Sequence, residues 1–232
     1  MEKTNRKIKL SLILPIYNEE DSIANFLEDF YSNFQNDLLY ELIVVDDNSD
    51  DKSVEIVKKH KNKTKNIKLI KNLKRIGRGG SFKLGLKEAQ GEIIGYMDSD
   101  GQIEVENIRR AIKLIESGYD LVVGERIEKN TKLIRRFFSY SFRIVAHFLR
   151  GLPSKDPLTG FKFFKREVLL RIIEKSQDNY WFFDFEIVEI SFKNRFKIAN
   201  LPIIFWDYNN NHISKTKLLT DSIYYLRNLL FL

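Results

Sequence analysis

The chain has 232 residues, of which 43% are hydrophobic and 31% are charged, and this suits one soluble globular domain with a sizeable core. It contains no cysteine, which excludes disulfide bonds and is compatible with a reducing, cytoplasmic setting. The net charge is +7, with a dense basic tract at Lys52–Lys87, and charge alone would suit nucleic acid, anionic lipid or a phosphorylated substrate.

Neither a membrane span nor a secretory signal is expected from the sequence. No run of about 18 uninterrupted apolar residues occurs, so we expect no transmembrane helix. The N-terminal stretch Met1–Lys7 is charged and lacks the apolar core of a signal peptide. We therefore expect a cytoplasmic location.

The first half of the chain alternates apolar strands with helices. Strands are predicted at Ile8–Leu14, Glu41–Asp46, Ile67–Lys71, Glu92–Asp98 and Asp120–Gly124. Helices are predicted between them, near Asp21–Phe34, Lys52–Lys59, Gly80–Ala89 and Val105–Ser117. This alternation predicts an α/β fold with a mostly parallel sheet that is covered by helices on both faces.

The second half of the chain does not show this alternation. We predict helices at Gly160–Lys175 and Asp184–Lys193, and a strand at Lys197–Ile203. Leu133–Leu152 is basic and aromatic, with apolar residues at helical spacing and arginines that recur every seven residues. Leu218–Leu232 has a second apolar stripe. Both stripes fit amphipathic helices, which either lie on a membrane surface or pack on the core or in a dimer.

Three of the apolar strands lead directly into acidic and polar residues. Leu10–Leu14 is followed by Pro15-Ile16-Tyr17-Asn18-Glu19-Glu20, and Leu42–Val45 by Asp46-Asp47-Asn48-Ser49-Asp50. The third strand, Ile93–Met97, is followed by Asp98-Ser99-Asp100-Gly101-Gln102. Open α/β sheets bind ligands at the carboxyl ends of their strands, so a site is expected at this edge.

The spacing of Asp98, Asp100 and Gln102 suggests a metal site. In an extended strand end alternate side chains point the same way, so these three are expected to converge. Carboxylate and amide oxygens are suitable ligands for a hard divalent cation, which commonly shares its remaining positions with substrate phosphates. An acidic turn without a metal is the alternative reading of the same residues.

Further along the chain, several short motifs accompany these strand ends. They are Arg75-Ile76-Gly77-Arg78-Gly79-Gly80, Gly124-Glu125-Arg126, Leu133–Ser139, Asp156–Arg166 and Phe183-Asp184-Phe185-Glu186. Taken in order, the elements from Leu12 to Lys215 resemble glycosyltransferase family 2. This family consists of inverting GT-A enzymes that use nucleotide-sugars. The resemblance is strongest to the branch that makes dolichyl- and polyprenyl-phosphate sugars, the dolichol-phosphate mannose synthases among them.

The resemblance implies roles for residues on the donor side. The donor nucleotide would be bound by Pro15, Tyr17, Glu19, Asp46, Asp47, Gly77, Arg78 and Asp98. A Mg²⁺ or Mn²⁺ ion would be held by Asp98, Asp100 and Gln102, with Asp100 also counted as catalytic. The family often has His-Pro after this glutamine, whereas this chain has Ile103-Glu104.

On the acceptor side, the resemblance implies that Arg126, Arg135, Ser139 and Lys215 hold the acceptor phosphate, and Arg126 is also counted as catalytic. Asp184 is the third catalytic residue, either as a base or in positioning the donor sugar. Positioning is favoured, because a phosphate acceptor is already anionic near neutral pH. Relatives usually have Arg and Gly before the Ser-Lys pair, whereas Asp207–Ile213 is rich in asparagine here, which puts the role of Lys215 in doubt.

The function implied by the resemblance is the inverting transfer of one sugar to polyprenyl or dolichyl phosphate at a membrane surface. The Asp-x-Asp-x-Gln form favours mannose from GDP-mannose, whereas Trp181–Glu186 resembles the glucosyltransferases that use UDP-glucose. A non-catalytic nucleotide-sugar-binding protein of the membrane surface is an alternative from another class. No nucleic-acid-binding motif accompanies the charge, and the oligomeric state is left open.

These expectations define two regions. Residues 1–205 form the GT-A domain, including an interfacial segment at 133–152. Residues 206–232 form a closing loop and a C-terminal amphipathic helix. The protein is expected to associate peripherally with the cytoplasmic face of a membrane.

Overall fold

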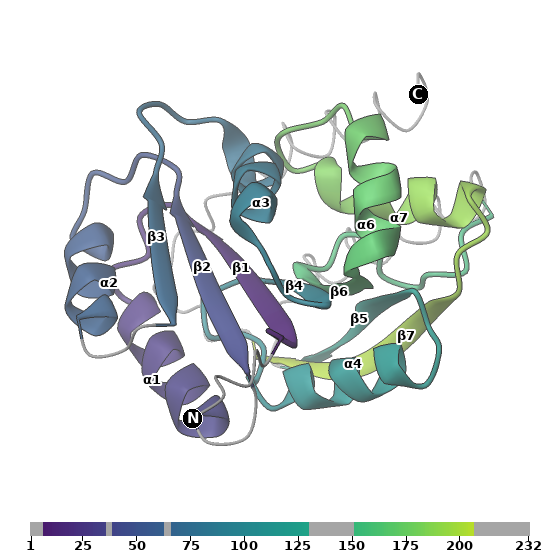
Figure 1. The fold of residues 1–232 in the computed structure, drawn as a ribbon, viewed down its shortest axis with the longest axis horizontal. Helices are drawn as coiled ribbons and strands as arrows, with labels where there is room; N and C mark the ends of the chain where they lie inside the picture. Colours follow the sequence, from purple (N-terminus) through teal and green to yellow (C-terminus); the bar gives the residue numbers. More distant parts are fainter. Residues whose placement is uncertain (1–6, 36–38, 63–65, 130–150, 207–232) are drawn as a thin grey trace, which may run out of the picture.

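A computed structural model describes residues 7–35, 39–62, 66–129 and 151–206. Seven strands form one sheet in the order β3-β2-β1-β4-β6-β5-β7 (Figure 1). The strands are β1 (Leu10–Ile16), β2 (Tyr40–Asp46), β3 (Ile67–Lys71), β4 (Ile93–Met97), β5 (Leu121–Lys129), β6 (Phe161–Lys165) and β7 (Ile198–Trp206). The first four strands in this order are parallel, and β6 runs antiparallel to both β4 and β5, while β5 and β7 are parallel. The predicted α/β fold with a mixed, mostly parallel sheet is confirmed.

Helices cover both faces of the sheet (Figure 1). They are α1 (Ile23–Phe34), α2 (Ser53–Lys61), α3 (Gly77–Glu88), α4 (Asn107–Glu116), α6 (Arg166–Ile172) and α7 (Phe183–Lys193), with a short 3₁₀ turn at Ile173–Lys175. Helices α1 and α4 contribute to one hydrophobic cluster, and α3, α6 and α7 contribute to a second. Alternate residues of β1 divide between the two clusters, with Leu12 in the first and Ile13 in the second, because successive strand side chains point to opposite faces.

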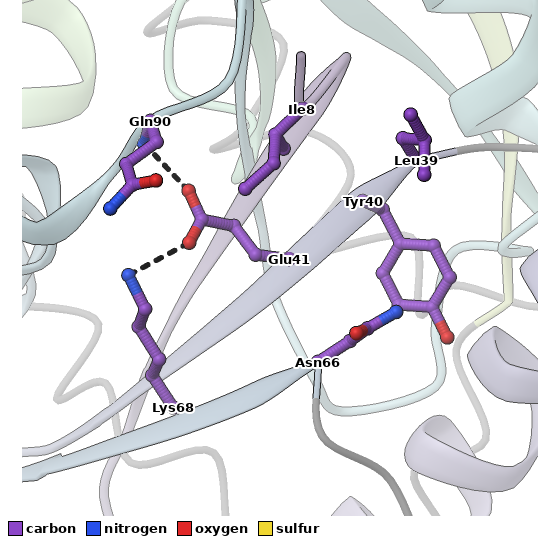
Figure 2. A pocket seen from close by; sticks show the side chains of 7 residues that line it. All are labelled: Ile8, Leu39, Tyr40, Glu41, Asn66, Lys68 and Gln90. Atoms are coloured by element: carbon purple, nitrogen blue, oxygen red, sulfur yellow. Dashed lines mark hydrogen bonds and ion pairs between the residues drawn. The ribbon is translucent and has the colours of Figure 1, made fainter. Parts of the chain in front are cut away.

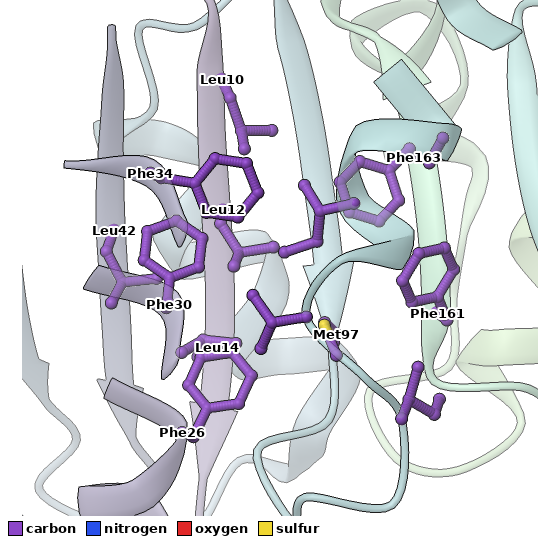
Figure 3. Packing of buried hydrophobic residues seen from close by; sticks show 14 of the residues in the cluster. Leu10, Leu12, Leu14, Phe26, Phe30, Phe34, Leu42, Met97, Phe161 and Phe163 are labelled. Carbon is purple, nitrogen blue, oxygen red and sulfur yellow. The ribbon is translucent and has the colours of Figure 1, made fainter. Parts of the chain in front are cut away.

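Aromatic residues dominate the contact between α1 and the sheet. Phe26, Phe30 and Phe34 recur every four residues along the helix and face Leu12, Leu14 and Leu42 of the strands (Figure 3). The rings of Phe30 and Phe34 lie 4.9 Å apart between centroids, and Phe30 meets Tyr40 edge-on at 5.0 Å. The four-residue spacing places the three phenylalanine rings on one face of the helix, and this apolar face packs against the sheet.

A buried carboxylate joins the strands at the amino end of the sheet. Glu41 on β2 accepts hydrogen bonds from Ser11 Oγ and from the backbone N–H of Gln90, both at 2.6 Å, and pairs with Lys68 Nζ at 2.9 Å. Glu41, Lys68 and Gln90 line a cavity of about 250 Å³ together with Tyr40 (Figure 2). The cavity lies at the opposite end of the sheet from the acidic residues that follow β1, β2 and β4.

The prediction of a helix at Gly160–Lys175 is partly wrong. Residues 161–165 of the predicted Gly160–Lys175 helix form strand β6, and only Arg166–Ile172 is α-helical. Strand β6 lies between β4 and β5, and Phe161, Phe163 and Phe164 are all buried there. Aromatic residues suit a pleated surface, and the two neighbouring strands supply the ladder of hydrogen bonds that a helical reading of the sequence does not consider.

Several other boundaries differ from the prediction, among them those of α3 and β5. Helix α3 begins at Gly77 rather than Gly80, so the glycine-rich motif forms the first turn of the helix instead of a loop before it. Strand β5 continues to Lys129, beyond the predicted end at Gly124. The predicted interfacial segment at 133–152, except for its last two residues, and the C-terminal segment from 207 onward lie outside the described residues. Within the described part of the chain, no helix has both the length and the apolar character to cross a bilayer.

Candidate active site

The predicted site residues that the structure describes gather at the carboxyl edge of the sheet. Strands β2, β1 and β4 are parallel neighbours, so the segments that follow them leave the sheet at the same edge. Antiparallel β6 begins at this edge, with Phe161 opposite Met97. The order of strands therefore brings together segments that are far apart in the sequence.

Asp98 is the first residue after β4. Its backbone N–H donates to the carbonyl of Gly160 at 3.0 Å, and its carboxylate contacts the guanidinium of Arg78. A Cβ atom on residue 160 would overlap this carboxylate, so a larger residue there would displace the Asp98 side chain. Burial raises the pKa of Asp98 to about 7, and the carboxylates of Asp100 and Asp184 act in the same direction while Arg78 opposes them.

Asp100 lies in the turn after Asp98. Its Oδ1 accepts the backbone N–H of Gln102 at 3.0 Å, and Gly101 between them has a φ of 75°. The strand ends at Met97, so the extended backbone assumed in the prediction does not continue to Gln102. Desolvation raises the pKa of Asp100, and the nearby carboxylate of Glu19 adds to the effect while the Gln102 N–H opposes it.

The donor set around Asp98 fits a hard divalent cation. Two carboxylates lie close together after one strand, where Asp100 raises the pKa of Asp98, and a bound cation would offset this repulsion. Their oxygens, together with the amide oxygen of Gln102, are the ligand type that Mg²⁺ and Mn²⁺ take. Among the described residues there is no cluster of three or more His, Cys, Asp or Glu side chains placed for a metal. The set of two carboxylates and one amide therefore remains a prediction.

Asp184 lies in the first turn of α7 and is 1% exposed. Its Oδ1 accepts from Lys162 Nζ at 2.9 Å, and its Oδ2 lies 3.5 Å from both Tyr96 Oη and Arg78 Nη1. The guanidinium of Arg78 thus lies between Asp184 and Asp98. Sequence reasoning placed Asp184 and Arg78 in the site without indicating that they touch.

Arg126 on β5 is held by a second buried carboxylate. Its Nε and Nη2 donate to the two oxygens of Asp156 at 2.7 and 2.9 Å, and its backbone N–H donates to the same group at 3.2 Å. Asp156 is fully buried. One edge of the guanidinium is therefore used to fix the side chain. Arg135, Ser139 and Lys215, the other predicted acceptor residues, lie outside the described residues.

Tyr17 is central to the part of the site that is predicted to bind the nucleotide base. The guanidinium of Arg75 lies over the Tyr17 ring, 3.7 Å from its centroid. Pro15, Tyr17 and Glu19 are all half-buried where β1 ends. A flat ring backed by a cation at a strand end is a suitable platform for a planar base.

Two of the residues predicted to bind the nucleotide accept hydrogen bonds from backbone N–H groups. Asp47 accepts the N–H groups of Ile76 at 2.8 Å and Gly77 at 3.0 Å, and so holds the start of α3. Asp46 accepts the N–H of Ser49 at 3.2 Å and so closes the turn after β2. Both carboxylates shape the loops at this edge, and Gly77 is held with a φ of 82°.

Lys162 and Asp156 are absent from the predicted site, although both belong to the motif Asp156–Arg166. A lysine between phenylalanines in the stretch Phe161-Lys162-Phe163-Phe164 is the signal that could have identified one of them. All four side chains are buried. Burial lowers the pKa of Lys162, while the negative charge of Asp184 opposes the shift.

The fold is that of the GT-A transferases. The chain superposes with a TM-score of 0.75 on glucosyl-3-phosphoglycerate synthase from Mycobacterium tuberculosis, solved in complex with Mn²⁺, UDP and glucosyl-3-phosphoglycerate. The superposition covers 96% of this chain and 79% of that one, at 19% identity. Residues 11–173 match glycosyl transferase family 2, and the chain belongs to this family.

Two named relatives act on dolichyl or dolichol phosphate. The chain is 29% identical to a dolichyl-phosphate beta-glucosyltransferase of Dictyostelium discoideum, over 84% of this chain and 66% of the relative. It is 31% identical to a dolichol-phosphate mannosyltransferase of Pyrococcus furiosus, over 85% of this chain and 56% of the relative. The chain thus spans less than two thirds of the length of either relative.

Proposed function

We propose that this chain transfers one sugar from a nucleotide-sugar to dolichyl or polyprenyl phosphate, with inversion and with a divalent cation. The arrangement around Arg78 carries the proposal. At the carboxyl edge of a family 2 fold, this guanidinium lies between Asp98, next to Asp100, and Asp184 at the start of α7. This gives one place where a nucleoside diphosphate and a sugar would meet groups suited to each.

Mg²⁺ or Mn²⁺ would be held by Asp98, Asp100 and Gln102, and when bound it supplies positive charge that stabilises the departing diphosphate. The chain's own residues supply the rest of the donor site. Tyr17 and Pro15 form the floor for the base, while Glu19 and the loops held by Asp46 and Asp47 surround the ribose. Gly77 lets the first turn of α3 approach the phosphates, and Arg78 adds a donor to them.

On the acceptor side, Arg126 binds the lipid phosphate together with Arg135, Ser139 and Lys215. One phosphate oxygen forms a bond to the anomeric carbon while the bond from that carbon to the diphosphate oxygen breaks, and the electron pair leaves with the diphosphate. An acceptor phosphate is largely deprotonated near neutral pH, so no base is required. Asp184, held by Lys162, therefore orients the sugar instead of removing a proton.

Glucose from UDP-glucose is the first donor we propose. The Dictyostelium relative is named a glucosyltransferase, and the motif Trp181–Glu186 resembles that group. Mannose from GDP-mannose, predicted from the Asp-x-Asp-x-Gln form, is the second candidate, and the named Pyrococcus mannosyltransferase supports it. We place the protein at the cytoplasmic face of a membrane, where a lipid-linked acceptor is accessible.

The test offers labelled UDP-glucose and GDP-mannose in turn, with polyprenyl phosphate in vesicles, and measures label extracted with the lipid. We expect transfer from one donor, and its loss in excess chelator. Asp100→Ala should lower the rate by at least on the order of 10²–10³, because the charge on the leaving group is no longer compensated. Donor binding without any transfer would favour the non-catalytic alternative, and full activity in chelator would disprove the metal role.

A further inference from the structure

Lys162 occupies a position where an apolar residue would be expected. Its neighbours on β6, Phe161, Phe163 and Phe164, are buried, and the lysine itself has no exposed surface. Burying an ammonium is costly unless a partner compensates its charge, and a buried ion pair is often no more stabilising than apolar side chains of similar volume. Stability alone is therefore a poor explanation for this lysine.

The ammonium of Lys162 is directed at Asp184. Its Nζ donates to Asp184 Oδ1 at 2.9 Å and also contacts the carbonyl of Thr159. Tyr96 lies opposite Lys162 in the β4–β6 ladder, and its hydroxyl lies 3.5 Å from Asp184 Oδ2. Two strands of the sheet therefore hold one carboxylate of α7 in place.

Arg78 links this buried pair to the predicted metal site. Its Nη1 lies 3.5 Å from Asp184 Oδ2, while its Nη2 contacts Asp98. One guanidinium is thus shared by two carboxylates, and Lys162 provides further positive charge to one of them. If Lys162 were absent, Asp184 would compete more strongly with Asp98 for the guanidinium, because opposite charges attract strongly where water is excluded.

We propose that Lys162 is a positioning residue: it neutralises Asp184 and thereby keeps Arg78 shared between Asp184 and Asp98. This inference rests on the proposed function, since it assigns Lys162 to the same site. Lys162 is fully buried and acts through Asp184 and Arg78 rather than on a substrate.

The proposal predicts that turnover falls without any loss of cation affinity. In Lys162→Met, Arg78 moves toward Asp184, so Asp98 loses a positive neighbour and should bind Mn²⁺ as tightly as before or more tightly. Turnover should nevertheless fall on the order of 10²-fold, as expected when a reacting group is displaced by about 1 Å. Lys162→Arg keeps the charge and should retain most of the turnover.

A matched control is available on the same strand. Lys165 pairs with Asp120 at 2.9 Å at the other end of β6, so Lys165→Met also removes an ion pair, but away from the site. The movement of Arg78 can be followed directly, because its guanidinium carbon lies 4.7 Å from the centroid of the Trp181 ring. The chain has two tryptophans, so Trp206→Phe leaves Trp181 as the only source of tryptophan emission.

The experiment measures Mn²⁺ affinity by titration of the metal alone, Trp181 emission, turnover and thermal unfolding. We expect Lys162→Met to change the emission and lower turnover without weakening Mn²⁺ binding, while Lys165→Met leaves all three as in the parent. Parallel loss of Mn²⁺ affinity and turnover would indicate collapse of the site and overturn the proposal, as would unchanged emission.

If Lys162→Met does not fold, Asp184→Asn provides the second test with the opposite sign. This substitution removes the charge of Asp184, so Arg78 should lie closer to Asp98 and compete with the cation there. Mn²⁺ should therefore bind more weakly than in the parent, and unchanged affinity would overturn the proposal. Neither the titration nor the fluorescence needs a sugar donor. Absence of transfer by the parent protein would therefore refute the proposed function while leaving the role of Lys162 testable.

Discussion

At the scale of single residues, the ion pair with Asp156 fixes the position of the Arg126 side chain. Two of its guanidinium nitrogens bind the buried carboxylate of Asp156, at 2.7 and 2.9 Å, so the guanidinium is held along one edge. A guanidinium suits both this ion pair and the predicted contact with a phosphate, because its donors are fixed in one plane. The acceptor role predicted for Arg126 is therefore compatible with its ion pair.

We predict that Arg126→Lys impairs turnover although the charge is kept. An ammonium cannot bind both oxygens of Asp156 and a phosphate in one plane, so turnover should fall on the order of 10²-fold, as after the loss of one preorganised donor. The free energy of unfolding should fall by about 2 kcal/mol, because a buried carboxylate loses a hydrogen bond. Donor affinity, titrated separately with nucleotide-sugar, should barely change.

Asp156→Asn serves as the companion variant. It keeps the shape of the side chain but removes the charge that fixes the guanidinium, so it should reproduce the fall in turnover with donor affinity intact. If donor affinity falls as far as turnover in either variant, Arg126 belongs to the donor site instead.

At the scale of elements, the amino end of the sheet depends on Glu41. Burial by itself raises the pKa of this carboxyl, but the Ser11 hydroxyl, the Lys68 ammonium and the Gln90 N–H outweigh it, so the pKa lies below the ordinary value. Figure 2 shows the contacts of Glu41 with Lys68 and Gln90. These partners come from β1, β3 and the segment before β4. One carboxylate therefore stabilises the start of four neighbouring strand segments.

We predict that Glu41→Gln lowers the free energy of unfolding by about 2 kcal/mol at pH 7, because charged hydrogen bonds are lost. The folded pKa is below the unfolded one, so the contribution is complete above the ordinary glutamate pKa of about 4.3 and is lost as the pH falls through the folded pKa. Urea unfolding from pH 7 down to pH 3 should therefore show the two proteins converging. Exposed Glu88→Gln is the control, and a gap that stays constant with pH would refute the linkage.

At the scale of the whole molecule, the lipid acceptor requires contact with a bilayer. The apolar stripe and arginines of Leu133–Leu152 predict that contact, and this segment lies almost entirely outside the described residues. Each basic residue near an anionic surface contributes about 1 kcal/mol, which salt weakens, whereas buried apolar side chains add a part that salt does not screen.

We predict binding to anionic vesicles that salt reduces but does not abolish. Replacing Phe137, Phe138 and Phe148 together by serine should weaken vesicle binding and transfer to long-chain lipid in parallel, while donor hydrolysis survives. Phe192→Ser, at an exposed position on α7, is the control. Unfolding of the triple variant would show that the segment belongs to the core, and normal use of long-chain lipid would show that the lipid enters elsewhere.

The sequence was sufficient for the features that depend on local pattern. The alternation of strands and helices predicted the α/β class, and the apolar period of α1 matches its buried face. The acidic residues after β1, β2 and β4 were placed at one edge, because parallel neighbours share an edge. The strand at Phe161–Lys165 was missed, since its paired residues in β4 lie 64–72 positions away along the chain and those in β5 lie 39–43 positions away.

Only the tertiary structure decided which charged groups touch. The pairing of Lys162 with Asp184, the sharing of Arg78 and the clamp of Asp156 on Arg126 each join residues from different elements. A sequence pattern specifies which residues follow a strand, but the antiparallel insertion of β6 determines which side chains then meet. Where water is excluded, these contacts between charged side chains decide the charge of each group, and therefore which ligands the site can bind.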